Sequence, residues 1–412
     1  MNQVAGVFEA DLYFSGVPQP VRLIRCAPLL DAMGDVFPTW PFRMERCDPA
    51  STPIITVRHV KGEYRIDAPW LEQSVFADTD ACAFSSIVVD LIYAWLEANP
   101  QALCLHCAAA EFGGRLVVFP NTNKVGKSLL VTRLMAERRT SYGDDLVALL
   151  PEGAGMSFGV PHRLRLPLPA SERAVAEFIQ AHRGKADTWS QYLAPNAPGL
   201  APFRQTRPIG AFVMLNRKPA GKAELIPADA ADSLQNIVYQ NLMRRGSALE
   251  VLDRAQWLAK EKPCWYLRYA RLDDAVALLR QAFVETDRGF SKAGHEHETA
   301  LTAAVEKITP RPNRPRSRAR RRASGRNYVR RPEVLIRQEQ GEFFLIQATG
   351  DEIFHLNALG RAVWELLAEP LSETETVALL ASVFPETSRA QIERDVIELF
   401  AAFRRKHLLL GS

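Results

Sequence analysis

Runs of alternating and apolar residues give the chain a β-rich beginning. Residues 8–14, 53–58 and 63–66 alternate loosely between apolar and polar positions, which predicts strands. Residues 81–98 carry apolar side chains at helical spacing, so we expect a long amphipathic helix there. We therefore predict a β-rich N-terminal part over residues 1–99.

Short apolar runs then alternate with amphipathic segments as far as residue 285. This alternation predicts a mixed α/β domain over residues 100–285. Strands are expected near 103–109, 115–119, 146–150, 209–215 and 265–269, and helices near 129–138, 233–244, 249–259 and 272–283.

A polar loop between the strand at 115–119 and the following helix carries the strongest chemical signal. A strand, a loop ending in Gly-Lys-Ser and a helix are the context of a phosphate-binding P-loop, in which backbone N–H groups and the helix N-terminus face phosphates. Lys127 would neutralise phosphate charge, and the Ser128 hydroxyl would ligate Mg²⁺. Asn121 replaces the first glycine of the motif, but asparagine tolerates a left-handed backbone. The loop residues are Asn121, Thr122, Asn123, Lys124, Val125, Gly126, Lys127 and Ser128, followed by Leu129.

Asp144 and Asp145 form the second chemical feature. They lie between the helix after the loop and a predicted strand. A P-loop requires an acid that holds Mg²⁺, and a kinase also needs a carboxylate that positions the acceptor. Two adjacent acids could divide these roles, whereas without the loop a solvated turn would be the simpler interpretation.

Other candidate residues flank these two motifs. His106 precedes the strand before the loop, where it could contact phosphate, transfer a proton or serve only the core. Cys104 and Cys107 surround it at C-x-x-C spacing, but zinc is not expected because no second cysteine pair exists. Arg163 and Arg165 follow the acids and could stabilise phosphoryl charge or belong to a surface strand.

The composition of the 412 residues is that of an ordinary globular protein. No stretch approaches a membrane-spanning helix, and the N-terminus lacks a signal pattern, so we expect a cytoplasmic protein without a membrane partner. The six cysteines are sparse for this length and fit reduced thiols.

Ten arginines and no acid occur between residues 310 and 331. The formal net charge of +4 depends on this run, since the rest of the chain has a net charge of 4 − 10 = −6. Residues 333–412 alone account for this negative charge, with thirteen acids and seven lysines and arginines. Such a run between ordered segments predicts a flexible linker, here residues 286–332. Nucleic acid is not expected as a partner, because no aromatic platform or recognition helix accompanies the run.

Ordered patterns return in residues 333–412. Apolar runs on both sides of Gly341 predict a β-hairpin, and helices are expected from Asn357, from Ser372 and over 388–406. A segment of this size can fold alone, so we predict a small α+β, winged-helix-like module.

His106-Cys-Ala-Ala-Ala, Gly126-Lys-Ser and Gly143-Asp-Asp-Leu resemble the HPr kinase/phosphorylase family in order and spacing. The likeness covers residues 100–285 and is greatest to the related kinases found beside clusters for ribosomal peptides, including lasso peptides. It implies a PEP-carboxykinase-like P-loop fold and ATP-dependent serine phosphorylation.

By the same resemblance, His106 and Lys127 belong to the catalytic site. Asp144 would activate the acceptor hydroxyl, and Asp145 would assist with the metal held by Ser128. No clear counterpart exists for the Glu-containing, Arg-Gly-rich segment that follows the acids in HPr kinases, which argues against phosphorylase activity and against HPr as the substrate.

The C-terminal module resembles the PqqD family of peptide-binding chaperones. Members add a leader peptide as a strand to their sheet beside the last helix, so the resemblance implies that residues 333–412 bind a leader. Trp364 is expected to serve only the core. The carrying segments are Phe354-His-Leu-Asn357, Gly360-Arg-Ala-Val-Trp-Glu-Leu-Leu367 and the helix with Ile392, Val396, Leu399 and Phe403.

Together these features predict an ATP- and Mg²⁺-dependent kinase that phosphorylates a serine of a ribosomally made precursor peptide. Docking the leader would raise the concentration of the acceptor at the active site. Two alternatives stay open: a non-catalytic nucleotide-binding adaptor that delivers the precursor to a partner enzyme, and an HPr-type regulatory kinase. Other peptide-maturation enzymes and homo-oligomerisation also stay open.

Overall fold

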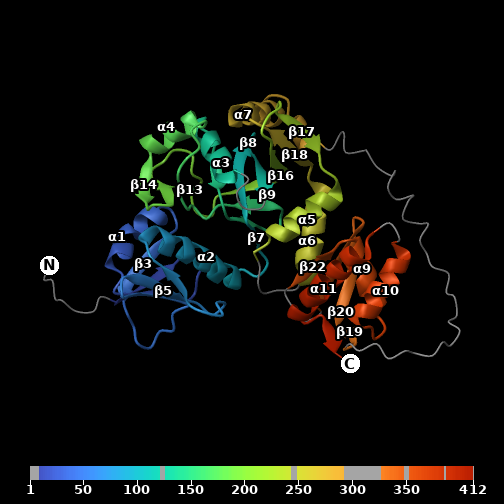
Figure 1. Cartoon of the computed structure of the whole chain (residues 1–412). Helices are drawn as coiled ribbons and strands as arrows, with labels where there is room; N and C mark the ends of the chain where they lie inside the picture. Colours follow the sequence, from blue (N-terminus) through green and yellow to red (C-terminus); the bar gives the residue numbers. More distant parts are fainter. Residues whose placement is uncertain are drawn as a thin grey trace, which may run out of the picture. The chain divides into compact units, whose positions relative to one another are not determined.

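A computed structural model of the chain divides into two compact units, which are described separately. The first comprises residues 1–245 and 254–295, and the second residues 246–253 and 296–412. Figure 1 shows the helices and strands of each unit. The structure describes residues 9–120, 126–242, 248–291, 326–347, 352–384 and 387–411.

The first unit begins with a mixed sheet, as the alternating segments predict. Its six described strands have the order β3-β1-β2-β4-β5-β6. The helix α1 was not predicted from the sequence; its proline occupies the first turn, where a missing N–H is tolerated. The elements are β1 Glu9–Phe14, β2 Val21–Ile24, α1 Ala27–Val36, β3 Phe42–Arg46, β4 Ile55–Val60, β5 Glu63–Asp67 and β6 Val75–Ala77.

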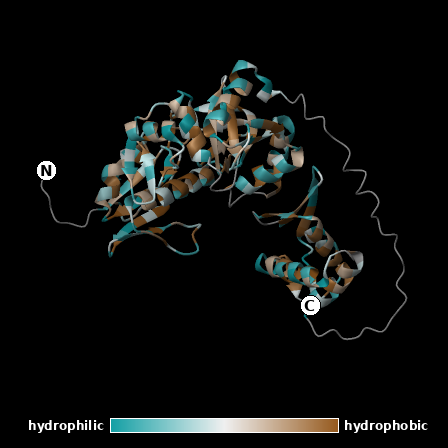
Figure 2. Cartoon of the chain, turned by 45° about the horizontal axis from the view of Figure 1, so that its top comes forward, coloured by the Kyte–Doolittle hydropathy of each residue, from teal (hydrophilic) through white to brown (hydrophobic). Residues whose placement is uncertain are grey.

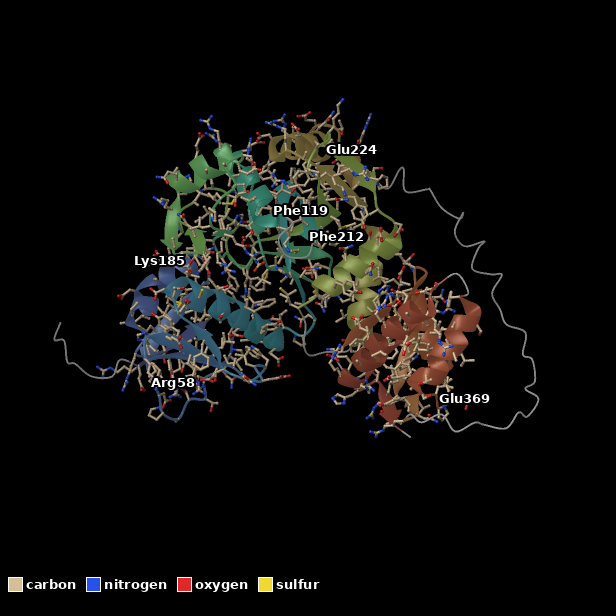
Figure 3. All side chains as sticks on the ribbon, in the orientation of Figure 1. Arg58, Phe119, Lys185, Phe212, Glu224 and Glu369 are labelled. Carbon is tan, nitrogen blue, oxygen red and sulfur yellow. The ribbon has the colours of Figure 1, made fainter. Side chains whose placement is uncertain are left out.

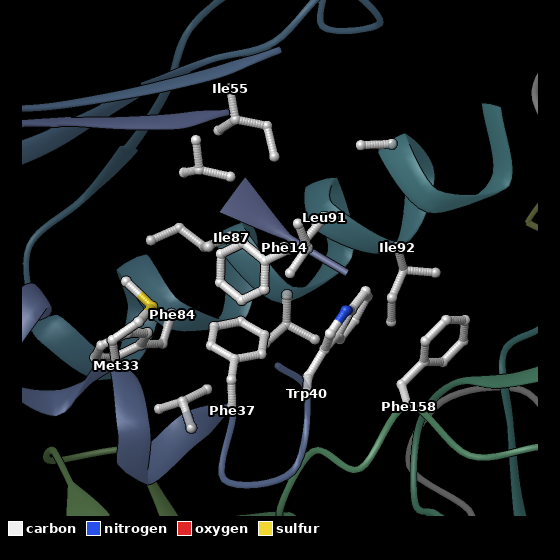
Figure 4. Close-up of a cluster of buried hydrophobic side chains, with 14 of the residues drawn as sticks. Phe14, Met33, Phe37, Trp40, Ile55, Phe84, Ile87, Leu91, Ile92 and Phe158 are labelled. Carbon is white, nitrogen blue, oxygen red and sulfur yellow. The ribbon is translucent and has the colours of Figure 1, made fainter. Parts of the chain in front are cut away.

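The long helix α2, Asp80–Ala98, confirms the helix predicted over 81–98. Thr79 caps its N-terminus by accepting a hydrogen bond from the N–H of Cys82. In the described part of the chain, α2 is the one helix long and apolar enough to cross a membrane, so the expectation that no stretch approaches such a helix was wrong. Two thirds of that window is buried, as in the core helix of many globular proteins. Figure 4 shows its side chains against the N-terminal sheet, including Phe84, Ile87 and Leu91 beside Phe14 and Phe37.

A second, branched sheet forms the centre of the first unit. The described residues contribute nine strands to it, and the long strand β16 pairs with β9, β12 and β18. The strands β9, β16 and β18 are parallel, so their carboxyl ends lie at one edge. The elements are β7 Leu103–Leu105, β8 Cys107–Phe112, β9 Arg115–Pro120, β10 Ser141–Gly143, β11 Val147–Leu149, β12 Ala154–Met156, β16 Thr206–Arg217, β17 Glu224–Pro227 and β18 Cys264–Tyr269.

Helices cover the central sheet and bury its apolar side chains. The side chains of α3 and α7 join one buried cluster with those of β8, β9 and β16. Figure 3 places Phe119 of β9 and Phe212 of β16 inside the unit, whereas Lys185 and Glu224 lie on its surface. The coloured ribbon in Figure 2 shows both hydrophilic and hydrophobic segments along these amphipathic helices. The helices are α3 Lys127–Ala136, α5 Ala230–Gln240 and α7 Leu272–Arg280, with short turns η1 Gln281–Glu285 and η2 Arg288–Phe290. The helix α6, Ala248–Glu261, is divided, because residues 248–253 belong to the second unit.

A small antiparallel sheet of order β13-β15-β14 adjoins this centre. The sequence patterns did not predict β14, β15 or α4, although α4 carries apolar residues at helical spacing, of which Val175 and Ile179 are buried. The elements are β13 Arg163–Arg165, α4 Arg173–Ala181, β14 Arg183–Ala186 and β15 Ser190–Leu193.

The second unit contains the predicted hairpin and three helices, together with strands that were not predicted. In the described residues, β20, β21 and β22 form an antiparallel sheet, and β19 pairs with β23. Trp364 is 1% exposed, which confirms its expected place in the core. The elements are β19 Tyr328–Arg330, β20 Val334–Glu339, β21 Glu342–Gln347, β22 Ile353–Leu356, α9 Ala358–Leu366, α10 Glu373–Val383, α11 Arg389–Arg405 and β23 Leu409–Gly411.

The strand β19 lies inside the range predicted as linker. Its Tyr328 packs edge-on against Phe400 of α11, and the guanidinium of Arg404 lies 5.3 Å from the tyrosine ring centre. The hydroxyl of Tyr328 also accepts a hydrogen bond from Arg404. The end of the arginine-rich run is therefore ordered because an aromatic anchor and a pairing strand are available to it.

Candidate functional site

The Gly-Lys-Ser segment forms the N-terminus of α3. Gly126 has φ +98°, a left-handed conformation that favours glycine, and the helix begins at Lys127, two residues earlier than predicted. A Cβ atom on Gly126 would lie 3.4 Å from the hydroxyl of Tyr269, so the backbone also passes close to β18. The predicted loop residues Asn121, Thr122, Asn123, Lys124 and Val125 lie outside the described residues.

A cavity of about 630 Å³ opens above this helix end. It is lined by elements that are far apart in the sequence: α2, the turn before β8, the start of α3, the loop after β10, and β13. Every predicted site residue in the described part of the chain lines it: His106, Gly126, Lys127, Ser128, Leu129, Asp144, Asp145, Arg163 and Arg165.

Lys127 is the buried cation of the cavity, with 6% of its surface exposed. Its ammonium donates a hydrogen bond of 3.4 Å to the carbonyl oxygen of His106. Burial lowers the pKa of Lys127, while the nearby Cys107, Asp145 and Asp144 act in the opposite direction. An anion bound at the N-terminus of α3 would restore favourable surroundings for this ammonium.

Asp144 is the buried acid of the pair and is 7% exposed. Its carboxylate accepts hydrogen bonds from the backbone N–H of Arg163, at 3.3 Å, and from the Ser128 side chain. Burial and then the charge of Asp145 raise the pKa of Asp144 to about 7, against the lowering effect of these hydrogen bonds. A carboxylate with this pKa is suited to accept a proton near neutral pH.

Asp145 has different surroundings, because its side chain is 53% exposed in the cavity. Its Oδ1 lies 2.5 Å from Nε2 of His106. Partial burial raises the pKa of Asp145, but the hydrogen bond and charge of His106 outweigh it, so the pKa is lowered overall. The two neighbouring carboxylates therefore have opposite pKa shifts, a pattern that often accompanies divided roles in a site.

The arrangement provides oxygen ligands for a hard cation. Mg²⁺ is usually held by one or two carboxylates together with substrate phosphates and water. The described residues contain no group of three His, Cys, Asp or Glu side chains suited to a metal. Ser128 and Asp145, both in the cavity, fit the smaller protein ligand set that Mg²⁺ requires.

Arg163 and Arg165 lie two residues apart on β13 and line the same cavity. The strand pairs with β15, with Arg163 opposite Tyr192 and Arg165 opposite Ser190. Arg163 is half-buried and Arg165 is exposed. The strand therefore supplies the site with two guanidinium groups that differ in their exposure to solvent.

His162 belongs to the supporting structure, and sequence reasoning did not single it out. Its fully buried ring lies 3.0 Å from Oγ1 of Thr132 in α3 and 2.7 Å from Oγ of Ser141 in β10. Burial lowers the pKa of His162 to about 3, so the ring is neutral. It therefore links the helix that begins at Lys127 to the strand that precedes Asp144.

Cys104 and Cys107 lie in different strands, β7 and β8, and both are buried as free thiols. Burial raises the pKa of both, to about 12 for Cys107. A thiol with a raised pKa is a poor nucleophile and a poor metal ligand at neutral pH, so these side chains serve the core.

The second unit presents an unpaired sheet edge at β22. In the described residues the sheet order leaves β22 without a partner on its outer side. The C-terminal end of α11 lies beside this edge: Lys406 forms an ion pair of 2.8 Å with Glu352, and its ammonium is 5.6 Å from the ring centre of Phe354. An exposed edge can accept an added strand.

Comparisons with known proteins bear on the second unit. No curated protein was found to match the chain. Residues 334–409 match the family described as Coenzyme PQQ synthesis protein D (PqqD). This range begins at the first residue of β20 and ends at the first residue of β23, so it covers the three-stranded sheet and the three helices. Residues 334–409 are therefore a PqqD-family domain.

Proposed function

We propose that the protein is an ATP- and Mg²⁺-dependent kinase that phosphorylates a serine of a ribosomally made precursor peptide. The observation that carries the proposal is the convergence of His106, Lys127, Ser128 and the two acids on one cavity. These residues come from three separate segments, and they provide the cation, hydroxyl and carboxylates that phosphoryl transfer uses. The sequence motifs that resemble the HPr kinase family, which imply a P-loop fold, are the second ground for the proposal.

The phosphates of ATP would lie against the N-terminus of α3. Backbone N–H groups and the ammonium of Lys127 would bind them, and the arginines of β13 would stabilise charge on the transferred group. Mg²⁺ would be held by Ser128 and Asp145, where it would neutralise charge on the phosphates. The hydrogen bond from His106 would fix the orientation of Asp145.

Asp144 would position the acceptor serine and accept its proton. Its pKa of about 7 lets it be ionised at neutral pH while it remains basic enough to take a proton. The same feature argues against a purely structural turn. Burying a carboxylate beside another one is unfavourable, and carboxylates with such raised pKa values occur mainly at functional sites.

The PqqD-family domain would bind the leader of the same peptide. The peptide would add as a strand to the free edge of β22, where backbone hydrogen bonds give affinity and side pockets choose sequence. Leader docking would then hold the acceptor segment near the first unit at a high effective concentration.

The test compares phosphorylation of a full precursor with that of its core lacking the leader. We expect kcat/KM to be at least tenfold higher for the full precursor, and Phe354→Arg, on the β22 edge, should remove this difference. Leu335→Arg is the matched control, because Leu335 is 42% exposed on the opposite edge strand, β20. Equal rates for both peptides in the unmodified protein would refute the role of the leader.

A non-catalytic adaptor is the main rival, and Asn121 in place of the first P-loop glycine favours it. Binding of ATP and of the leader without any phosphate transfer would establish that function. Phosphorylation of HPr, and not of the peptide, would instead establish a regulatory kinase.

A further inference from the structure

A second, smaller cavity adjoins the carboxylates in the first unit. Its volume is about 50 Å³, and its apolar wall includes Val88 and Ile92 of α2 together with Leu146, Phe158 and Val160. Ile92 and Phe158 also belong to the large buried cluster of the N-terminal part, and Figure 4 shows them on facing segments of the chain.

The two cavities meet at the acids. Asp144, Asp145 and Arg163 line both of them, whereas Lys127 and Ser128 line only the larger one. The smaller cavity therefore lacks the lysine and the helix N-terminus suited to the ATP phosphates, yet it reaches the carboxylate assigned to the acceptor serine.

The size and lining of the smaller cavity define what it can hold. The volume of about 50 Å³ is less than a tenth of that of the larger cavity, about 630 Å³. This suits a short aliphatic side chain such as that of valine or leucine better than a nucleotide. A charged side chain would lose its hydration against the apolar wall, and an acidic one would also be repelled by the two aspartates.

We propose that this cavity receives an aliphatic side chain next to the acceptor serine of the substrate peptide. The inference rests on the proposed kinase function and adds a sequence preference to it. Val88 and Val160 are among the apolar residues that line the smaller cavity and not the larger one, so changing the size of their side chains tests the preference. A flanking side chain that enters the cavity brings the serine hydroxyl toward Asp144.

The experiment uses the full chain and precursor peptides whose residues before and after the phosphorylated serine are replaced singly by leucine, alanine or aspartate. We expect kcat/KM for leucine to exceed that for aspartate by at least tenfold at one flank, a typical discrimination for an apolar pocket. Val88→Phe should fill the cavity and lower kcat/KM for the leucine peptide at least tenfold. The dissociation constant of ATP should change less than twofold.

An unchanged ATP affinity in Val88→Phe excludes a folding defect, and two further variants test the role of the cavity. Val160→Ala enlarges the cavity and should shift the preference from leucine toward phenylalanine. Val284→Phe makes the same change as Val88→Phe at a position that is 41% exposed and lines neither cavity, and it should have no effect.

The outcomes separate this inference from the proposed function. Phosphorylation with no preference at either flank, and equal rates in the Val88→Phe variant, would overturn the inference and leave the kinase function standing. Absence of phosphate transfer to every peptide by the unmodified protein would overturn both.

Discussion

His106 and Asp145 are joined by a contact of 2.5 Å, although 39 positions separate them in the sequence. His106 lies at the junction of β7 and β8, and Asp145 follows β10, which pairs with β8. The sheet therefore brings the histidine to the more exposed of the two acids. This contact lowers the pKa of Asp145, whereas burial beside Asp145 raises that of Asp144.

Replacing His106 with glutamine should slow phosphate transfer without preventing ATP binding. Asp145 would lose the partner that orients it, and loss of such a supporting contact typically lowers activity about tenfold to hundredfold. Steady-state kinetics and a separate measurement of ATP affinity would check this. His59→Gln is a suitable control, because His59 lies in β4 and does not line the cavity. Unchanged kcat in His106→Gln would show that the contact has no part in the reaction.

Replacing Asp144 with asparagine should make the protein more stable and inactive. The pKa of Asp144 is raised to about 7, so ionising it in the folded state is unfavourable and the native protein loses stability as the pH rises from about 4 to 7. Each pKa unit corresponds to about 1.4 kcal/mol, so removing the charge should add up to about 4 kcal/mol to the free energy of unfolding at pH 8. Denaturant unfolding in the presence of EDTA would measure it; a less stable variant at pH 8 would contradict the expectation.

The buried ring of His162 should make the stability of the first unit sensitive to acid. Its pKa is about 3 in the folded protein and near 6.5 in an unfolded chain, so the unfolded state takes up a proton first as the pH falls. The resulting loss of stability begins below pH 6.5 and reaches about 2 kcal/mol at pH 5. In His162→Gln this part of the pH dependence should disappear. Parallel curves of unfolding free energy against pH for the two proteins would disprove the assignment.

Trp364 should stabilise the second unit without affecting the first. It is 1% exposed and packs edge-on against Phe403 of α11, with ring centres 5.5 Å apart. Trp364→Ala should cost about 3–5 kcal/mol, enough to unfold a domain of this size. Hydrogen exchange should then increase across β20 to α11 while ATP affinity stays the same. Trp189→Ala, at a residue of the first unit that is 69% exposed, should leave exchange in the second unit unchanged.

The convergence of the candidate site could be anticipated from the sequence because its residues lie in local patterns. Gly126, Lys127 and Ser128 follow a predicted strand and begin a predicted helix. The two acids follow β10, a strand that was not predicted, so their place beside the loop was inferred from the motifs alone. The strands β9 and β10 both pair antiparallel with β8, which brings their carboxyl ends to one edge of the sheet. His162 could not be found in this way, because its role depends on how α3 packs beside β10 and leaves no periodic signal in the sequence.

Several short elements were also missed. The helices α1 and α4 were overlooked although both carry buried apolar residues at helical spacing, Leu29 and Met33 in α1 and Val175 and Ile179 in α4. The strand β22 and the pair of β19 with β23 depend on partners elsewhere in the chain. By contrast, Asn357 and Ser372 were recognised as helix caps, and both accept the expected backbone hydrogen bond.

The central claim is that this cavity transfers phosphate from ATP to a precursor peptide. The most direct measurement is the mass of the precursor after incubation with Mg-ATP and the full chain. We predict the gain of a phosphate on serine, abolished by both Lys127→Ala and Asp144→Asn. An unchanged mass, with binding of ATP and the leader shown independently, would contradict the claim.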